Sequence, residues 1–142
     1  MHSFCLSLLA DYLKPGNVVL DVGSGSGYLT AVFGLMVGET GHTVGVEHIS
    51  ELVERSIDAI KMTPAAALME KGHLVVHVAD GKLGWEECGP YDAIHVGAAA
   101  AGRIYSLNSS ITNSLISSRR PLILYLELIS CLNDSQNSQK RW

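Results

Sequence analysis

Charged residues, cysteines and long apolar runs are all scarce in this 142-residue sequence, and each shortage excludes a class of protein. Charged residues make up 17% of the chain, the net charge is −4, and no basic patch is interleaved with aromatic residues, so we expect no nucleic-acid partner. The longest apolar runs fall well short of the ~20 residues that a membrane span needs, and no lysine or arginine precedes the apolar N-terminal stretch. We therefore expect neither a membrane span nor a signal peptide.

The three cysteines are widely scattered, and none of them forms a CxxC pair. Such a set does not build a disulfide framework and is typical of reduced thiols in a reducing compartment. The sequence therefore predicts a cytoplasmic protein, and we expect a monomer. Hydrophobic residues make up 47% of the chain, which is enough to bury the core of one globular domain.

Short apolar runs alternate with helical patterns over the first hundred residues. Four runs predict buried strands, at residues 18–22, 42–47, 74–78 and 91–99. The spacing of apolar residues predicts helices at residues 1–14, 28–37 and 50–62, the last with Ser50 as its N-cap. Strands separated by helices of this length predict an α/β fold, a doubly wound parallel sheet with helices on both faces and the strand order 3-2-1-4.

The composition changes near residue 101, which divides the chain into a core (residues 1–100) and a divergent Ser/Asn-rich tail (residues 101–142). Gly102 is the last of the 14 glycines. The tail holds one apolar run, at residues 122–132, whose periodicity fits a strand or a helix equally.

A glycine-rich loop follows the first predicted strand and opens the next helix. It reads D-x-G-x-G-x-G, with Asp21 before Gly23, Gly25 and Gly27. A loop of this kind turns backbone N–H groups toward a ligand, although a plain tight turn has the same composition. A dinucleotide fingerprint needs G-x-G-x-x-G, and Tyr28 occupies its last position, so the pattern disfavours an NAD-dependent oxidoreductase.

Two acidic residues follow the next two predicted strands. Glu47 lies 20 residues beyond Gly27, where a carboxylate can accept hydrogen bonds from ribose hydroxyls, although a solvated strand-end carboxylate fits too. Asp80 precedes Gly81 at the end of the third strand. Spacing alone leaves open whether Asp80 binds an adenine amino group or only forms a turn.

Three histidines lie in or beside strands. His73 and His77 are four residues apart, which along a strand is too far for both to bind one metal ion, so we predict no metal site. His95 lies inside the fourth predicted strand, and we expect it to be a packed residue of the core or of a cleft.

Taken together, DVGSGSGYLTA, GVEHISELVERSI, VADGKLGW and PYDAIHVGAAA resemble protein-L-isoaspartate (D-aspartate) O-methyltransferases, over residues 1 to about 100. The resemblance implies a Rossmann-like methyltransferase fold with S-adenosyl-L-methionine as the cofactor. It implies methyl transfer to the free carboxylate of L-isoaspartyl and D-aspartyl residues, which initiates repair of damaged proteins. Isoaspartyl-containing proteins and peptides would be the substrates.

The resemblance also implies a set of cofactor-binding residues: Asp21, Gly23, Ser24, Gly25, Gly27, Glu47, His48, Asp80 and Gly81. His2 matches a histidine expected near the cofactor. No catalytic residue is predicted, because the substrate carboxylate, with a pKa near ~4, is already ionised at neutral pH and needs no general base. Orientation of the two reactants is then the main task of the protein.

The sequence also departs from the family pattern. A Ser/Thr-bearing segment of the substrate site has no counterpart before Met1, and no K-P-G-G turn follows the alanine run. We therefore expect a truncated variant whose C-terminal strands are missing or replaced. The alternative to an active enzyme is a catalytically impaired variant that binds only the cofactor or a partner.

Overall fold

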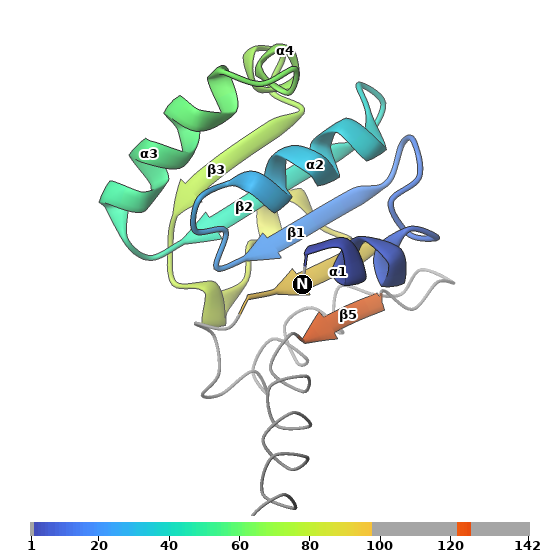
Figure 1. The fold of residues 1–142 in the computed structure, drawn as a ribbon. Helices are drawn as coiled ribbons and strands as arrows, with labels where there is room; N and C mark the ends of the chain where they lie inside the picture. The colour runs from blue at the N-terminus through green and yellow to red at the C-terminus, as the bar shows by residue number, and fades with distance from the viewer. Residues whose placement is uncertain (1, 98–121, 126–142) are drawn as a thin grey trace, which may run out of the picture.

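The computed structural model describes residues 2–97 and 122–125, which form one parallel sheet with helices packed on it (Figure 1). The five strands are β1 Val18–Val22, β2 His42–Glu47, β3 Leu74–Val78, β4 Ala93–Val96 and β5 Leu122–Tyr125. Their order in the sheet is β3-β2-β1-β4-β5, and every neighbouring pair is parallel. The predicted α/β fold and the predicted order of the first four strands are both confirmed.

The fifth strand comes from the apolar run whose conformation the sequence left open. Leu122–Tyr125 pairs in parallel with Ala93–Val96, so β4 is an inner strand of the sheet. The rest of that run, with most of the tail and the alanine run, lies outside the described residues.

Within the described residues, four α-helices accompany the strands: α1 His2–Leu9, α2 Tyr28–Val37, α3 Ser50–Lys61 and α4 Ala66–Glu70. Of these helices, only α2 both begins and ends at the residues that the sequence predicts. The first helix ends at Leu9, not at residue 14, because the chain turns there and brings Leu13 into the core. The assignment of Ser50 as N-cap was wrong, because Ile49 is the cap and Ser50 is the first helical residue.

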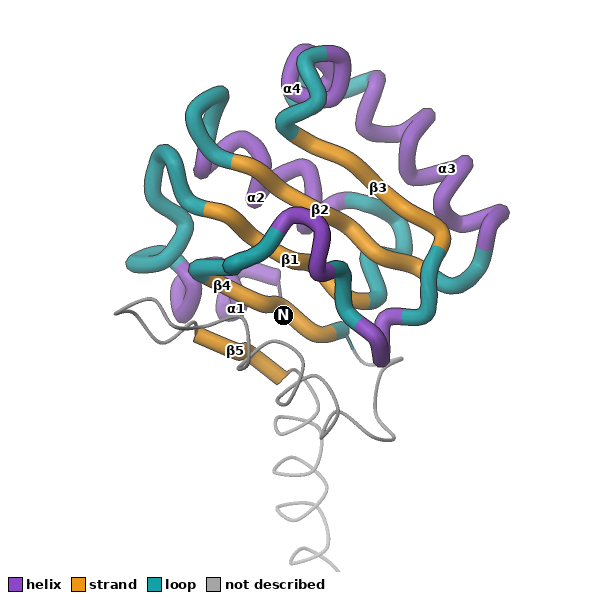
Figure 2. Tube along the Cα trace, turned by 180° about the vertical axis from the view of Figure 1, so that it is seen from behind, coloured by secondary structure: helices purple, strands orange, loops and turns teal. Residues whose placement is uncertain are grey.

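The two faces of the sheet are covered differently. The α-helices pack on one face (Figure 1), whereas the loop over residues 79–92 crosses the other (Figure 2). That loop holds two short 3₁₀ helices, η1 Gly81–Leu83 and η2 Glu86–Cys88. Helices thus lie on both faces, but within the described residues those on the second face are single turns.

Side chains of β1 alternate between the two faces, as the pleat of a strand requires. Val19 packs with Phe33 of α2 on the helical face. Leu20 and Val22 pack with Tyr91 on the loop face. A Cβ atom at Gly34 of α2 would lie 2.5 Å from Leu74 Cδ1, so this glycine lets the helix approach the sheet closely. Among the described residues, no helix has the length and apolar character required to cross a membrane.

Candidate cofactor site

A pocket of about 330 Å³ opens at the carboxyl ends of β1 and β2. Its lining residues are Val22, Gly23, Val46, Glu47, His48, Asp80, Gly81 and Lys82. Five of the nine predicted site residues are in this set, brought from three separate stretches of sequence by the parallel pairing of β1, β2 and β3. This is the edge at which open α/β sheets bind their ligands.

Glu47 lies at the centre of the hydrogen bonds around the pocket. Its side chain is only 5% exposed, so it is not the solvated strand-end carboxylate that the sequence left as an alternative. Oε2 accepts from the N–H of Gly25 at 3.1 Å, and Oε1 accepts from the N–H groups of His48 at 2.9 Å and Ile49 at 3.3 Å. The carboxylate therefore ties the glycine loop to the turn after β2.

His48 borders the same carboxylate. Its Nδ1 lies 2.9 Å from Glu47 Oε1, while 66% of the side chain is exposed. The ring therefore lies at the rim of the pocket and Glu47 in its wall. A ligand in the pocket would contact both groups, since both line it.

The glycine loop depends on backbone angles that favour glycine. Gly23, Gly25 and Gly27 all have positive φ, at 75°, 52° and 77°. At Gly27 a Cβ atom would also lie 2.9 Å from Ser56 Cβ of α3. Gly27 therefore serves the packing of the loop on α3, and it does not line the pocket.

The expectation that this loop turns its N–H groups toward a ligand was wrong for four of its residues. The N–H groups of Gly23 and Ser24 donate to the carbonyl of Val46, at 2.8 and 3.2 Å. The N–H of Gly25 donates to Glu47, and that of Gly27 donates to the carbonyl of Ser24 at 2.9 Å. These amides are satisfied within the protein, so they form no cradle for a phosphate group.

Ser24 and Asp21 lie beneath the loop and do not line the pocket. The Cβ of Ser24 faces β2, 3.2 Å from the position of a Cβ at Gly45, and its Oγ has no partner among the described residues. Asp21 is 1% exposed, and its carboxylate bonds to Thr30 and His95. The cofactor-binding roles predicted for these two residues therefore stay predictions.

Asp80 and Gly81 also line the pocket. Asp80 Oδ1 accepts from the N–H of Lys82 at 3.0 Å and caps η1, which confirms its turn-forming role. Because Asp80 also lines the pocket, its role in ligand binding stays a prediction. A Cβ atom at Gly81 would lie 2.5 Å from Val22 Cγ1, so the backbone passes close to β1 here.

Sequence reasoning missed three lining residues, Val22, Val46 and Lys82. Val22 and Val46 are adjacent in sequence to the predicted Gly23 and Glu47, and this adjacency could have identified them as lining residues. The side chain of His2 lies outside what the structure describes, so its expected place near the cofactor stays a prediction.

Comparison with known proteins gives consistent matches. The sequence model of the family "Protein-L-isoaspartate(D-aspartate) O-methyltransferase (PCMT)" matches residues 1–106. A protein-L-isoaspartate O-methyltransferase of Triticum aestivum is 62% identical over 100 residues, covering 70% of this chain and 44% of the relative. One of Caenorhabditis elegans is 42% identical over 123 residues, covering 87% of this chain and 52% of the relative. The chain thus spans about half the length of these relatives.

Solved structures agree with the sequence matches. A protein-L-isoaspartate O-methyltransferase structure from Plasmodium falciparum, in complex with S-adenosyl-L-homocysteine, has a TM-score of 0.66 and 28% identity and covers 89% of this chain and 60% of that one. A precorrin-6y C5,15-methyltransferase of Geobacter metallireducens has a TM-score of 0.68 and 16% identity, and the match covers 98% of this chain and 69% of that protein. At this identity the match supports only the fold. The family match includes all the described residues that line the pocket. The chain therefore belongs to the protein-L-isoaspartate (D-aspartate) O-methyltransferase family.

Proposed function

We propose that the chain binds S-adenosyl-L-methionine in the pocket at the carboxyl ends of β1 and β2. We propose further that it transfers the methyl group to the free carboxylate of L-isoaspartyl and D-aspartyl residues in damaged proteins. Family membership supports the reaction, and the S-adenosyl-L-homocysteine complex of the Plasmodium falciparum protein supports the cofactor. Since the chain spans about half of its relatives, the complete activity is part of the proposal.

The observation that carries the proposal is the buried carboxylate of Glu47 in the pocket wall. Three backbone N–H groups hold this side chain in place. A carboxylate at the end of the second strand is the group that accepts hydrogen bonds from the two ribose hydroxyls of a nucleoside. His48 at the rim and Asp80 in the pocket lining would complete the contacts to the nucleoside.

The glycine loop fits a cofactor that has no phosphate. A pyrophosphate would require N–H donors from this loop, and those of Gly23, Ser24, Gly25 and Gly27 are already bonded within the protein. The amino-acid part of S-adenosyl-L-methionine has no phosphate, and its ammonium group needs acceptor oxygens, which a close approach to the backbone of the glycine loop supplies. This is the argument against a dinucleotide in the same pocket.

The residues of this chain act by binding and orientation. When bound, S-adenosyl-L-methionine supplies an electrophilic methyl group on a sulfonium. The substrate carboxylate, with a pKa near ~4, is already a nucleophile at neutral pH, so no side chain needs to remove a proton. Glu47 and the glycine loop would hold the cofactor so that the carboxylate approaches in line, at roughly 3–3.5 Å.

Further expectations belong to the same proposal. We propose a cytoplasmic monomer whose macromolecular partners are isoaspartyl-containing proteins, without nucleic-acid or membrane partners. We also retain the division into a methyltransferase core over residues 1–100 and a divergent tail over residues 101–142. Elution as a monomer in size-exclusion chromatography is the expected result for the purified chain.

Calorimetric titration with S-adenosyl-L-homocysteine tests the cofactor site. We expect micromolar binding by the natural chain and a loss of about ten-fold or more in Glu47→Gln. The amide replaces one carboxylate oxygen by an NH2 group, which donates and cannot accept from the backbone N–H groups or from the ribose hydroxyls. Glu54→Gln is the control, since Glu54 is an exposed residue of α3 outside the pocket. Absence of binding by the natural chain would refute the proposal.

A methylation assay separates the active enzyme from the impaired variant. Radiolabelled methyl transfer to an isoaspartyl peptide, but not to the matching aspartyl peptide, is expected from an active chain. Binding of S-adenosyl-L-homocysteine without methyl transfer would leave the alternative, a variant that binds only the cofactor or a partner.

A further inference from the structure

Three buried polar side chains meet beneath the glycine loop. Asp21 of β1, Thr30 of α2 and His95 of β4 are each at most 2% exposed. The Oγ1 of Thr30 donates to Asp21 Oδ2 at 2.6 Å, and His95 Nδ1 lies 2.8 Å from Asp21 Oδ1. Both oxygens of a buried carboxylate are thereby bonded, on the face of the sheet that otherwise buries Phe33 and Val19.

The bond between Asp21 and Thr30 closes the glycine loop across its two ends. Asp21 lies two residues before Gly23, and Thr30 is the third residue of the helix that the loop opens. His95 stands opposite Asp21 in the β1–β4 register. Two residues further on, the N–H of Gly97 donates to the carbonyl of Val22 at 2.8 Å, so the end of β4 abuts the start of the loop.

The chemistry of the pair assigns a direction to the hydrogen bond. A carboxylate only accepts, so Nδ1 of His95 carries the proton and donates to Asp21. Nε2 has no hydrogen-bond partner among the described residues, and the ring meets Phe33 edge-on at a centroid distance of 5.6 Å. A histidine bonded on one side only is costly to bury, since an apolar residue would fill the same space without an unpaired atom.

We propose that His95 is a positioning residue for cofactor binding. Its Nδ1–H holds the carboxylate of Asp21 in the orientation that also accepts from Thr30. Asp21 in turn keeps the loop from Gly23 to Gly27 closed between β1 and α2. The inference rests on the proposed function, because the ligand that the closed loop serves is the S-adenosyl cofactor.

Two matched substitutions separate this role from packing. Asn places an amide N–H where histidine carries Nδ1, whereas Gln places its amide near the position of Nε2. Both His95→Asn and His95→Gln lose the ring contact with Phe33. We expect S-adenosyl-L-homocysteine to bind His95→Asn within about three-fold of the natural chain and His95→Gln about ten-fold or more weakly. Equal affinities in the two variants, whether both lowered or both unchanged, would overturn the inference.

Amide hydrogen exchange of the unliganded chain supplies a second readout. We expect faster exchange at Gly25 and Gly27 in His95→Gln than in His95→Asn, with exchange in β2 and β3 unchanged. This readout needs no cofactor, so it distinguishes failure of the inference from failure of the proposed function. If the natural chain does not bind S-adenosyl-L-homocysteine yet the loop exchange differs as expected, only the cofactor assignment fails.

Thr30→Val covers the case in which His95→Gln does not fold. This change removes the hydroxyl that bonds Asp21 Oδ2 and keeps the shape of the side chain. We expect it to speed exchange at Gly25 and to weaken S-adenosyl-L-homocysteine binding about three-fold or more. Unchanged exchange and unchanged affinity in Thr30→Val would show that the bonds of Asp21 do not hold the loop.

Discussion

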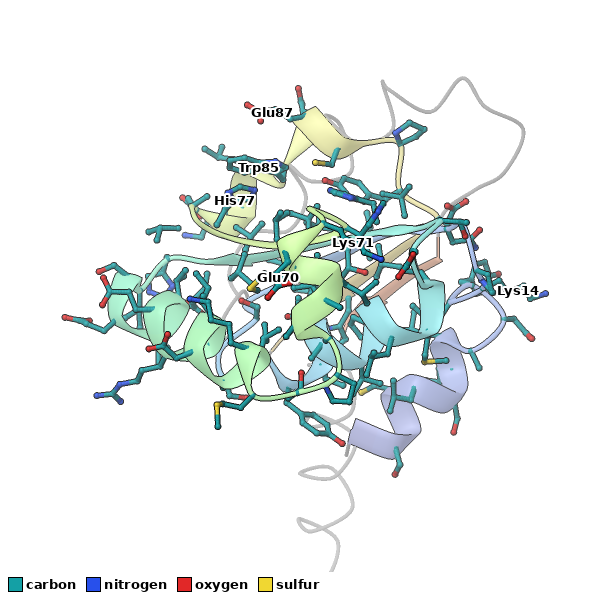
Figure 3. The ribbon with its side chains drawn as sticks, turned by 90° about the horizontal axis from the view of Figure 1, so that it is seen from above. Lys14, Glu70, Lys71, His77, Trp85 and Glu87 are labelled. Atoms are coloured by element: carbon teal, nitrogen blue, oxygen red, sulfur yellow. The ribbon has the colours of Figure 1, made fainter. Side chains whose placement is uncertain are left out.

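The helical face and the loop face of the sheet bury the same strands by different means. On the helical face, Phe33 and Leu9 are fully buried side chains of α2 and α1. On the loop face the cover consists of side chains from one irregular segment, chiefly Tyr91 and the partly buried Trp85. Figure 3 shows Trp85 lying over His77 of β3, and the two rings stack at a centroid distance of 4.1 Å.

The two faces also contribute differently to the pocket. The loop face supplies a wall of the pocket directly, because Asp80, Gly81 and Lys82 begin the segment that covers it. Among the residues that the structure describes, none of α1 or α2 lines the pocket, but the helical face holds the Asp21 carboxylate beneath the glycine loop. We infer that the apolar contacts of the helical face chiefly stabilise the fold, whereas those of the loop face also shape the site. Four substitutions test this division.

Phe33→Ala is expected to have the largest effect on stability. The side chain is fully buried between α2 and the sheet, so its loss removes apolar contact and leaves a cavity. The free energy of unfolding should fall by about 3–5 kcal/mol. Urea unfolding monitored by circular dichroism measures the change. A loss smaller than that caused by any change on the loop face would contradict the division.

Trp85→Ala is expected to lower the stability less than Phe33→Ala does, and to weaken cofactor binding more. The indole is only partly buried, so the free energy of unfolding should fall by about 2 kcal/mol, below the range for core aromatics. The loop that carries Asp80 and Gly81 loses its stacking contact with His77 of β3, so binding of S-adenosyl-L-homocysteine should weaken about ten-fold. Calorimetric titration at a temperature where the variant is folded measures the affinity. Unchanged affinity would show that Trp85 does not influence the pocket.

Tyr91→Phe should lower the free energy of unfolding by about 1 kcal/mol at neutral pH. The hydroxyl of this buried side chain donates to the carbonyl of Trp85, and that bond joins two parts of the loop. The substitution leaves the carbonyl without this donor. Urea unfolding at pH 7 measures the loss, and Tyr12→Phe, at an exposed tyrosine, is the control.

The same variant predicts a pH dependence. Burial raises the pKa of the Tyr91 phenol, and the nearby Cys88 and Glu87 raise it further. The unfolded chain ionises this phenol near pH ~10, so its contribution to stability is complete below that pH and decreases as the pH rises above it. The advantage of the natural chain over Tyr91→Phe should therefore shrink as the pH rises above ~10. A constant difference would contradict the raised pKa.

His77→Ala is expected to have the smallest effect. The histidine is partly exposed and its main described contact is the stack on Trp85, with an interplanar angle of 10°. The free energy of unfolding should fall by roughly 0.5–1 kcal/mol. Thermal unfolding measures the change. A loss as large as that in Trp85→Ala would mean that the stack, and not the contact with the sheet, holds the loop.

Local patterns predicted several elements of the fold with their limits. The bounds of β1, β2, β3 and α2 agree with the predicted ones, because each apolar run ends at a glycine or a turn. The short helix α4, Ala66–Glu70, was not predicted, since five residues are too few to show a helical period. The fourth strand begins at Ala93, not at Tyr91, whose ring packs into the loop face instead.

The candidate site was predicted in part. Glu47, Asp80 and the glycine loop were identified because the carboxyl ends of parallel strands meet at one edge of a sheet. The direction of the loop amides was not predicted. It depends on the carbonyl of Val46, which reaches the loop only after β1 and β2 pair. His95 was expected to be buried, but its partner Asp21 lies 74 residues away and joins it only through the pairing of β1 with β4.

The sequence by itself determined the family, the alternation of strands and helices and the place of the glycine loop, because these depend on neighbouring residues and on short motifs. Tertiary structure alone decided which side chains line the pocket, which face carries α-helices and which partner each buried polar atom finds. It also decided that Leu122–Tyr125 forms a strand beside β4. A five-stranded sheet brings together residues that are far apart in the chain, and their hydrogen bonds form only where the register of the strands aligns them.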